Sequence, residues 1–198
     1  MAGQLDADAA AKSVLRREVL AARDALAPAT RVAASARITQ QFLALDAWKN
    51  ARCVLAYLSF GSEFDTAALV DDARTSGKTL CLPRVDRDRR ELAIHRFDDL
   101  TADVQAGVWG IREPRPDRPT VTLDRVDFVL VPGVAFTPRC ERLGYGGGFY
   151  DRLIARFAQR PPLVAAAFDV QMRDEIPLSK RDRSIDLVIT ETAAHCGC

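Results

Sequence analysis

Residues 128–154 read FVLVPGVAFTPRCERLGYGGGFYDRLI, and they contain three parts that decide the fold. The segment begins with an apolar run, Phe128 to Pro132, of the kind found in strands that are buried on both faces. A loop over residues 133–148 follows, and a helix is expected from Phe149 to about Gln159. A strand, a loop and a helix in this order indicate one unit of an α/β protein.

The end of that loop has the properties of a phosphate-binding loop. Glycine stands at positions 144, 146, 147 and 148, and glycine can adopt positive φ and let the backbone approach a ligand closely. Asp151 adds a carboxylate beside the expected phosphate, so a cation is needed between them and the pattern indicates a magnesium-bound nucleotide. Neither G-x-x-x-x-G-K-[ST] nor G-x-G-x-x-G is present. The alternative is a tight turn in which four glycines serve packing alone, at a high cost in conformational entropy.

The rest of the chain alternates helix and strand patterns. Helices are expected over residues 10–26, 30–45 and 66–75, and strands over residues 51–59, 79–83, 92–97, 163–168 and 187–190. Residues 107–120 are rich in proline and glycine and are expected to form an irregular, mobile active-site segment. The pattern predicts one three-layer α/β/α domain over residues 1–198, with a mostly parallel sheet and frayed tails at 1–9 and 192–198. Ligands of such sheets bind beyond the carboxyl ends of the strands.

Composition excludes several classes of function. The formal net charge is +1, which argues against nucleic acid and anionic membranes as partners, because both require a basic face. No apolar run has the length of a membrane span, and the first residues lack the pattern of a signal peptide. Five cysteines without a C-x-x-C pair fit a reducing compartment, so a cytoplasmic protein is expected. The terminal Cys196 and Cys198 are interpreted as part of a frayed tail rather than a soft-metal site.

The glycine loop resembles the signature of the 5-formyltetrahydrofolate cyclo-ligase family, also called 5,10-methenyltetrahydrofolate synthetases. Four other segments resemble further motifs of that family: KSVLR at 12–16, LSFGSEFDT at 58–66, WGIREP at 109–114, and the C-terminal acidic segment with Asp182, Ser184, Ile185 and Asp186. Together the motifs extend from about residue 12 to residue 191. The resemblance implies a three-layer α/β/α fold similar to that of sugar-phosphate isomerases and CoA transferases.

The resemblance also implies the reaction. It is the conversion of 5-formyltetrahydrofolate to 5,10-methenyltetrahydrofolate with ATP as co-substrate, through a phosphorylated formyl oxygen and with release of ADP and phosphate. By the same resemblance the ATP-binding residues are Lys12, Ser13, Val14, Leu15, Arg16, Arg142, Leu143, Gly144, Tyr145, Gly146, Gly147, Gly148, Phe149 and Tyr150. Lys12 and Arg16 lie four residues apart, so a helix places both cations on one face. Arg17 and Arg23 are expected to be surface charges.

The resemblance further implies a folate site and a metal site. The folate-binding residues are Leu58, Glu63, Tyr145, Gly146, Gly147, Gly148 and Phe149. The Glu63 carboxylate can accept hydrogen bonds from the amino and N–H groups of the pterin ring. Asp151 and Asp186 are the expected Mg²⁺ ligands. For both residues the alternative is structural: Asp151 as an acid at a helix start, and Asp186 as a surface acid at a strand edge.

Some residues depart from the family pattern. Arg181 stands before Asp182 where family members often have histidine, and Gly147 stands where some have lysine. Two other interpretations therefore stay open: a phosphate-binding isomerase or acyl-CoA transferase on the same architecture, and a folate or nucleotide binding module without catalysis. A monomer or a weak homo-oligomer is expected.

Overall fold

The computed structural model describes residues 2–107 and 110–197. The helices are α1 (Ala2–Asp24), α2 (Pro28–Ala44), α3 (Asp46–Asn50), α4 (Ala67–Thr75) and α5 (Phe149–Ile154). The strands are β1 (Cys53–Leu55), β2 (Thr79–Asp86), β3 (Glu91–Arg96), β4 (Val104–Ala106), β5 (Arg112–Pro114), β6 (Phe128–Leu130), β7 (Ala135–Phe136), β8 (Arg142–Leu143), β9 (Leu163–Ala166), β10 (Leu187–Ile189) and β11 (Ala194–Cys196). Trp109 and Cys198, which belong to two of the predicted motifs, lie outside the described residues.

A seven-stranded sheet forms the centre of the molecule, in the order β11-β10-β9-β6-β1-β2-β3. The five inner strands are parallel, and the two edge strands β11 and β3 run antiparallel to their neighbours. The mostly parallel α/β sheet predicted from the sequence is thus confirmed. The likeness to sugar-phosphate isomerases and CoA transferases stays a prediction.

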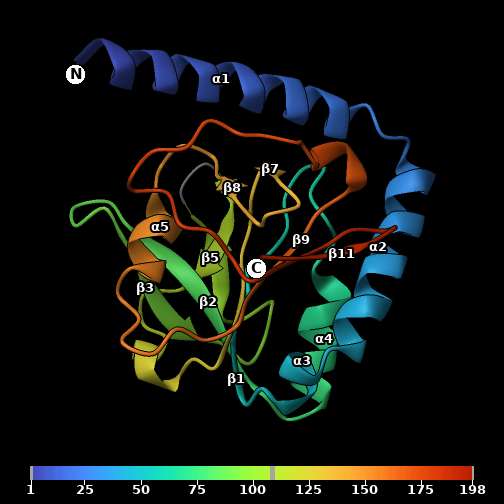
Figure 1. Ribbon diagram of the computed structural model, residues 1–198. Helices are drawn as coiled ribbons and strands as arrows, with labels where there is room; N and C mark the ends of the chain where they lie inside the picture. The colour runs from blue at the N-terminus through green and yellow to red at the C-terminus, as the bar shows by residue number, and fades with distance from the viewer. Residues whose placement is uncertain (1, 108–109, 198) are drawn as a thin grey trace.

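Helices cover both faces of this sheet, as Figure 1 shows with α2, α3 and α4 on one side and α5 on the other. Successive residues of a strand point to opposite faces, so Val54 packs with the α2 and α4 side while Leu55 packs with the α5 side. Because both faces are covered, the inner strands β1, β6 and β9 are apolar at every position rather than at alternate ones.

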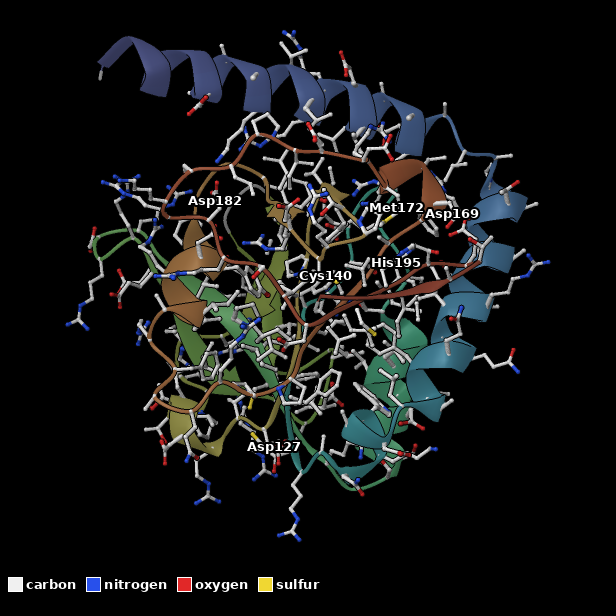
Figure 2. All side chains as sticks on the ribbon, viewed as in Figure 1. Asp127, Cys140, Asp169, Met172, Asp182 and His195 are labelled. Atoms are coloured by element: carbon white, nitrogen blue, oxygen red, sulfur yellow. The ribbon has the colours of Figure 1, made fainter. Side chains whose placement is uncertain are left out.

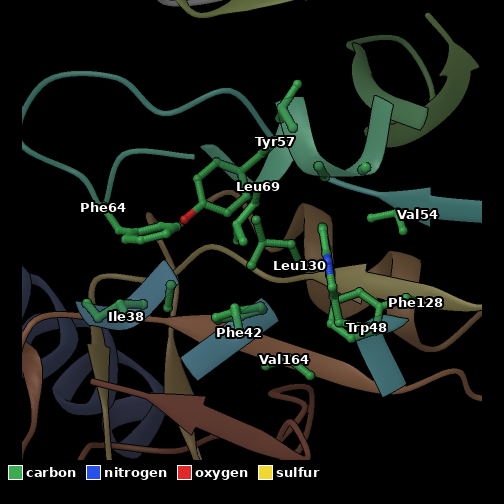
Figure 3. Packing of buried hydrophobic residues seen from close by; sticks show 14 of the residues in the cluster. Ile38, Phe42, Trp48, Val54, Tyr57, Phe64, Leu69, Phe128, Leu130 and Val164 are labelled. Carbon is green, nitrogen blue, oxygen red and sulfur yellow. The ribbon is translucent and has the colours of Figure 1, made fainter. Parts of the chain in front are cut away.

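Aromatic rings fill the core between the sheet and α2 to α4 (Figure 3). The Trp48 and Phe128 rings meet edge to face with centroids 5.3 Å apart, and Phe42 stacks on Phe64 at 6.5 Å. The Trp48 indole N–H donates to Asp72 Oδ2 at 2.8 Å, so its polar atom is satisfied although the ring is buried. This core anchors α3, a short helix that the sequence pattern did not predict.

Helix α1 lies across one end of the sheet and apart from the other helices (Figure 1). Its residue Val19 is fully buried in a small cluster with Val134, which precedes β7, and Leu143 of β8; β7 and β8 form a two-stranded sheet. The helix therefore docks on the segment that leads into the glycine loop. No described helix has an apolar stretch long enough to cross a membrane.

Three predicted segments differ from the structure. A frayed tail was expected over residues 1–9, but α1 begins at Ala2. Within residues 107–120 an irregular segment was expected, but residues 112–114 form β5 and pair with β4; Pro114, which lacks an N–H, stands at the end of that strand. Frayed residues were expected from 192 on, but β11 pairs with β10 and covers the edge of the sheet. β11 has only three residues, Ala194–Cys196, which is too short for a periodic pattern to indicate a strand.

Candidate active site

A cavity of about 880 Å³ opens where β1, β2 and β6 end, on the side of the sheet where α1 lies. Its wall combines segments that are far apart in sequence: α1, the residues after β1, β5, the glycine loop, the start of α5 and residues 179–182. The position agrees with the rule that ligands of parallel sheets bind beyond the carboxyl ends of the strands. Almost all predicted site residues line it, whereas Ser13, Val14 and Leu15 do not.

The glycine loop uses its glycines for two different purposes. Gly146 and Gly148 have φ of 105° and 64°, the left-handed region that favours glycine. Gly144 and Gly147 do not have positive φ, contrary to prediction, and are needed for space. A Cβ at Gly147 would lie 2.6 Å from Cδ2 of Phe149, and one at Gly144 would lie 2.7 Å from Nη1 of Arg142.

Two cations of α1 face the cavity together, as their spacing predicted. Arg16 Nε donates to the carbonyl oxygen of Gly144 at 2.7 Å, which places its guanidinium beside the glycine loop. Lys12 Nζ donates to the carboxylate of Asp182, the acid that Figure 2 places close to α1. This contact holds the pKa of the Asp182 carboxyl below its usual value, against the opposing effect of burial. Ser13 and Val14 are exposed between these positions on another face of the helix, and Leu15 packs into the cluster under α1.

Asp151 lies in the wall and is paired with a buried cation. Arg142 Nη2 donates to its Oδ1 at 2.7 Å, and the backbone N–H of Arg183 donates to the same oxygen at 3.1 Å. The Arg142 side chain is only 3% exposed, and no described residue accepts a bond from its Nε. Asp151 is therefore tied to the strand before the glycine loop and to the C-terminal segment at once.

Asp186 does not join Asp151, so the structure corrects the predicted pair of metal ligands. Its Oδ2 accepts from the backbone N–H of Leu163 at 2.8 Å, and its Oδ1 pairs with Arg160 at 2.9 Å. Asp186 comes before β10, and in a parallel sheet the start of a strand lies at the edge away from the cavity. Asp127 makes the equivalent bond, to the N–H of Cys53 at the start of β1, and Figure 2 shows it at the end of the molecule away from Asp182.

Glu63 lies half-buried on the other side of the glycine loop. Its Oε1 accepts from the hydroxyl of Tyr145, and its Oε2 accepts from the backbone N–H of Phe60 at 3.1 Å. Burial raises the pKa of the Glu63 carboxyl, while these bonds and the charge of Arg23 act against the rise. The Phe60 and Tyr145 rings lie 5.6 Å apart, and both residues line the cavity together with Glu63.

Two phenols add donors to the same wall. Burial raises the pKa of Tyr57 and Tyr150, so both hydroxyls keep their protons at neutral pH. The Tyr150 hydroxyl oxygen is buried, and no described residue forms a hydrogen bond with it. A buried hydroxyl without a protein partner is costly unless a ligand or water satisfies it.

The sequence reasoning missed two residues of this region. Arg23 was expected to be a surface charge, but it is 3% exposed and bonded to Ser62 and Tyr145. Asp182 was quoted only as part of a motif, yet it pairs with Lys12 in the cavity. The seven-residue spacing of Arg16 and Arg23, two helical turns on one face, could have indicated the first. Arg181, which stands in place of the family histidine, also lines the cavity.

No group of three or more His, Cys, Asp or Glu side chains that could hold a metal ion is present among the described residues. If only the described residues supply protein ligands, a metal ion at the cavity would therefore need ligands from a bound molecule in addition to a carboxylate. Mg²⁺ commonly binds in this way, through one or two carboxylates and the phosphates of a nucleotide.

Comparisons with known proteins agree on one family. A family model described as the 5-formyltetrahydrofolate cyclo-ligase family matches residues 8–191. A 5-formyltetrahydrofolate cyclo-ligase from Saccharomyces cerevisiae is 31% identical over 202 residues, covering 91% of this chain and 95% of the yeast protein. One from Escherichia coli K12 is 30% identical over 142 residues, covering 71% and 78%. The solution structure of Aquifex aeolicus 5,10-methenyltetrahydrofolate synthetase superposes with a TM-score of 0.82 at 31% identity, covering 94% of this chain and 92% of that one.

Proposed function

The chain belongs to the 5-formyltetrahydrofolate cyclo-ligase family, and we propose that it converts 5-formyltetrahydrofolate to 5,10-methenyltetrahydrofolate with ATP as co-substrate. The observation that carries this proposal is the composition of the cavity. One wall holds a glycine loop with two helix cations beside it, and the adjoining wall holds the Glu63 carboxylate together with the Phe60 and Tyr145 rings. Such a site suits a polyphosphate and a flat, hydrogen-bonding ring at the same time.

The chemistry explains why both ligands are needed in one place. Ring closure requires N10 to attack the formyl carbon and the formyl oxygen to leave, and that oxygen is a poor leaving group. We infer that it first attacks the γ-phosphorus of ATP, with ADP as the leaving group. N10 then attacks the carbon, loses its proton, and displaces phosphate. Both steps depend mainly on alignment and charge stabilisation.

The residues of the cavity have distinct roles in this scheme. Arg16 and Lys12 contact the phosphates, with Lys12 exchanging its bond to Asp182 for one to a phosphate oxygen. Gly146 leaves space beside Arg16, since a Cβ there would lie 3.6 Å from Cζ of Arg16, and this space admits the phosphates. Tyr150, whose hydroxyl lacks a partner among the described residues, donates to one of the two ligands. Glu63 accepts hydrogen bonds from the pterin edge, and Tyr145 holds that carboxylate in place.

The donors also fit a magnesium ion at Asp151. Both protein hydrogen bonds go to its Oδ1, so we assign Oδ2 to the metal, with phosphate oxygens and waters as the other ligands. A bound Mg²⁺ would neutralise charge on the phosphates. Arg142 orients the Asp151 carboxylate, which is its contribution to the site.

We also propose that the enzyme works as a monomer or a weak homo-oligomer, because one chain supplies all groups named here. A cytoplasmic location remains a proposal, and one curated relative, from Arabidopsis thaliana, is named as mitochondrial.

The proposed reaction is tested by mixing the purified protein with Mg-ATP and 5-formyltetrahydrofolate. The absorbance of the methenyl product should rise, and ADP should appear in equal amount. Folate binding without product would instead favour a binding module. Phosphate-ligand turnover without ATP cleavage would favour an isomerase or a transferase.

A further inference from the structure

Arg23 is the last arginine of α1, and its guanidinium is buried away from solvent with 3% of the residue exposed. Its Nε donates to Ser62 Oγ at 2.9 Å, and its Nη1 donates to the hydroxyl oxygen of Tyr145 at 3.0 Å. A buried guanidinium is costly unless acceptors meet it. Ser62 and Tyr145 are such acceptors, and they belong to two different loops.

Each of the two hydroxyls also donates a hydrogen bond to a carboxylate. Ser62 Oγ donates to Asp24 Oδ1, and the Tyr145 hydroxyl donates to Glu63 Oε1. These hydrogen bonds form one chain of side chains in the order Asp24, Ser62, Arg23, Tyr145 and Glu63. Each hydrogen bond in it polarises the next. The negative charges at both ends compensate the buried positive charge at its centre.

This chain connects the parts of the cavity that were assigned to different ligands. Ser62 and Glu63 belong to the segment after β1, and Tyr145 belongs to the glycine loop. Among the described side chains, only Tyr145 donates a hydrogen bond to the Glu63 carboxylate, so the position of the carboxylate depends on where that ring is held. Arg23 fixes the ring and the neighbouring Ser62 with one rigid planar group.

We propose that Arg23 is a positioning residue of the folate site, which holds the glycine loop against the segment after β1 so that Glu63 faces the pterin in one orientation. The proposal rests on the proposed function, in which Glu63 accepts the pterin hydrogen bonds. Arg23 acts through Tyr145 and touches no reacting atom.

The charge of Arg23 has a second effect, on the ionisation of Glu63. Burial raises the pKa of this carboxyl, and Arg23 lowers it together with the bonds from Tyr145 and Phe60. The other titratable groups that interact with it are the phenols Tyr57 and Tyr150. Because both phenols stay protonated at neutral pH, Arg23 is the charge that favours the carboxylate, and its removal shifts the pKa upward.

The test is the equilibrium binding of 5-formyltetrahydrofolate without ATP, measured between pH 6 and pH 8 for the parent and for Arg23→Met. We expect about tenfold weaker binding of the variant, with a ratio that grows as the pH falls, because loss of the Arg23 charge raises the pKa of Glu63. Arg17→Met is the matched control, since Arg17 is exposed on the same helix and lies outside the cavity. It should bind as the parent does at every pH.

Arg23→Lys keeps the charge but cannot make both bonds, so it should show weaker binding with a ratio that does not change with pH. Tyr145→Phe removes only the hydroxyl. If Arg23→Met does not fold, the proposal is tested by combining Tyr145→Phe with Arg23→Lys. In the Tyr145→Phe background, Arg23→Lys should cause little further loss of affinity, because the bond that transmits its effect is already absent.

Parent-like binding by Arg23→Met, a loss of its affinity that is independent of pH, or additive losses in the double variant would overturn the proposal. These outcomes are separate from failure of the proposed function. If that function is wrong, the parent itself forms no methenyl product from 5-formyltetrahydrofolate and Mg-ATP, whatever the Arg23 variants do.

Discussion

Asp151→Asn is the substitution that separates a metal ligand from a structural acid at this site. The structure shows that Asp151 compensates the charge of Arg142, whose side chain is 3% exposed while that of Asp151 is 18% exposed. Asparagine keeps an oxygen that can accept the 2.7 Å bond but removes the negative charge. The structural alternative weighed from the sequence was an acid at a helix start, whose loss would cost at most about 1 kcal/mol.

The buried pair predicts a larger effect on stability. Removing one partner of a buried ion pair costs about 3–5 kcal/mol, and a hydrogen bond to a charged group contributes about 1.5–3 kcal/mol, part of which asparagine keeps. We therefore expect the free energy of unfolding to fall by about 2 kcal/mol. Urea denaturation of both proteins measures it. Asp71→Asn is the control, because Asp71 pairs with Arg74 at a similar distance of 2.8 Å but is 66% exposed, so its loss should have little effect.

The Asp151→Asn variant also tests the magnesium site, with rates measured under conditions in which the variant is folded. If Oδ2 binds Mg²⁺, the free magnesium concentration that gives half-maximal rate should rise about tenfold or more, while the affinity for folate stays nearly constant. An unchanged magnesium dependence together with lower stability would leave Asp151 as a structural partner of Arg142. Unchanged stability would contradict the assignment of a buried ion pair.

Three further substitutions test other parts of the site. Gly147→Val should weaken Mg-ATP binding by at least tenfold in a titration, because its Cβ would lie 2.6 Å from Phe149 and force that ring into the cavity; ATP affinity equal to the parent's would contradict this. Glu63→Gln should raise the dissociation constant of 5-formyltetrahydrofolate about tenfold and that of ATP much less, and equal losses would remove Glu63 from the folate site. Asp186→Asn should lower the urea midpoint through its bond to Leu163 and leave the magnesium dependence unchanged; a shifted magnesium dependence would restore it as a ligand.

The arrangement of the sheet could be predicted from the sequence because its strands are buried on both faces. Strands such as β6 and β9 are apolar at every position, and the helices between them have apolar residues on one face. The elements α3 and β11 were missed because each is only a few residues long. α3 has five residues and is held by one buried side chain, Trp48, and β11 forms because the edge of β10 is available for pairing.

The cavity residues could be predicted where a local pattern carries them. The spacing of Lys12 and Arg16 placed both on one face, and the glycines identified the loop. Which acidic residues lie at the cavity could not be predicted from a local pattern. Asp182 and Asp186 are four residues apart, yet the first contacts α1 at the cavity and the second binds the start of β9 at the other edge of the sheet. Asp186 lies immediately before β10, and the direction of that strand places Asp186 at the end of the sheet away from the cavity. The spacing of the two acids in the sequence does not reveal this.

The fate of the formyl oxygen tests the central claim most directly, namely that this cavity brings the γ-phosphate of ATP to that oxygen. The protein is given Mg-ATP and 5-formyltetrahydrofolate with ¹⁸O in the formyl group, and the released phosphate is analysed by mass spectrometry. We predict that each phosphate formed with the methenyl product carries one ¹⁸O atom. Unlabelled phosphate, with the label in water, would show that the oxygen leaves without phosphorylation and would contradict the account.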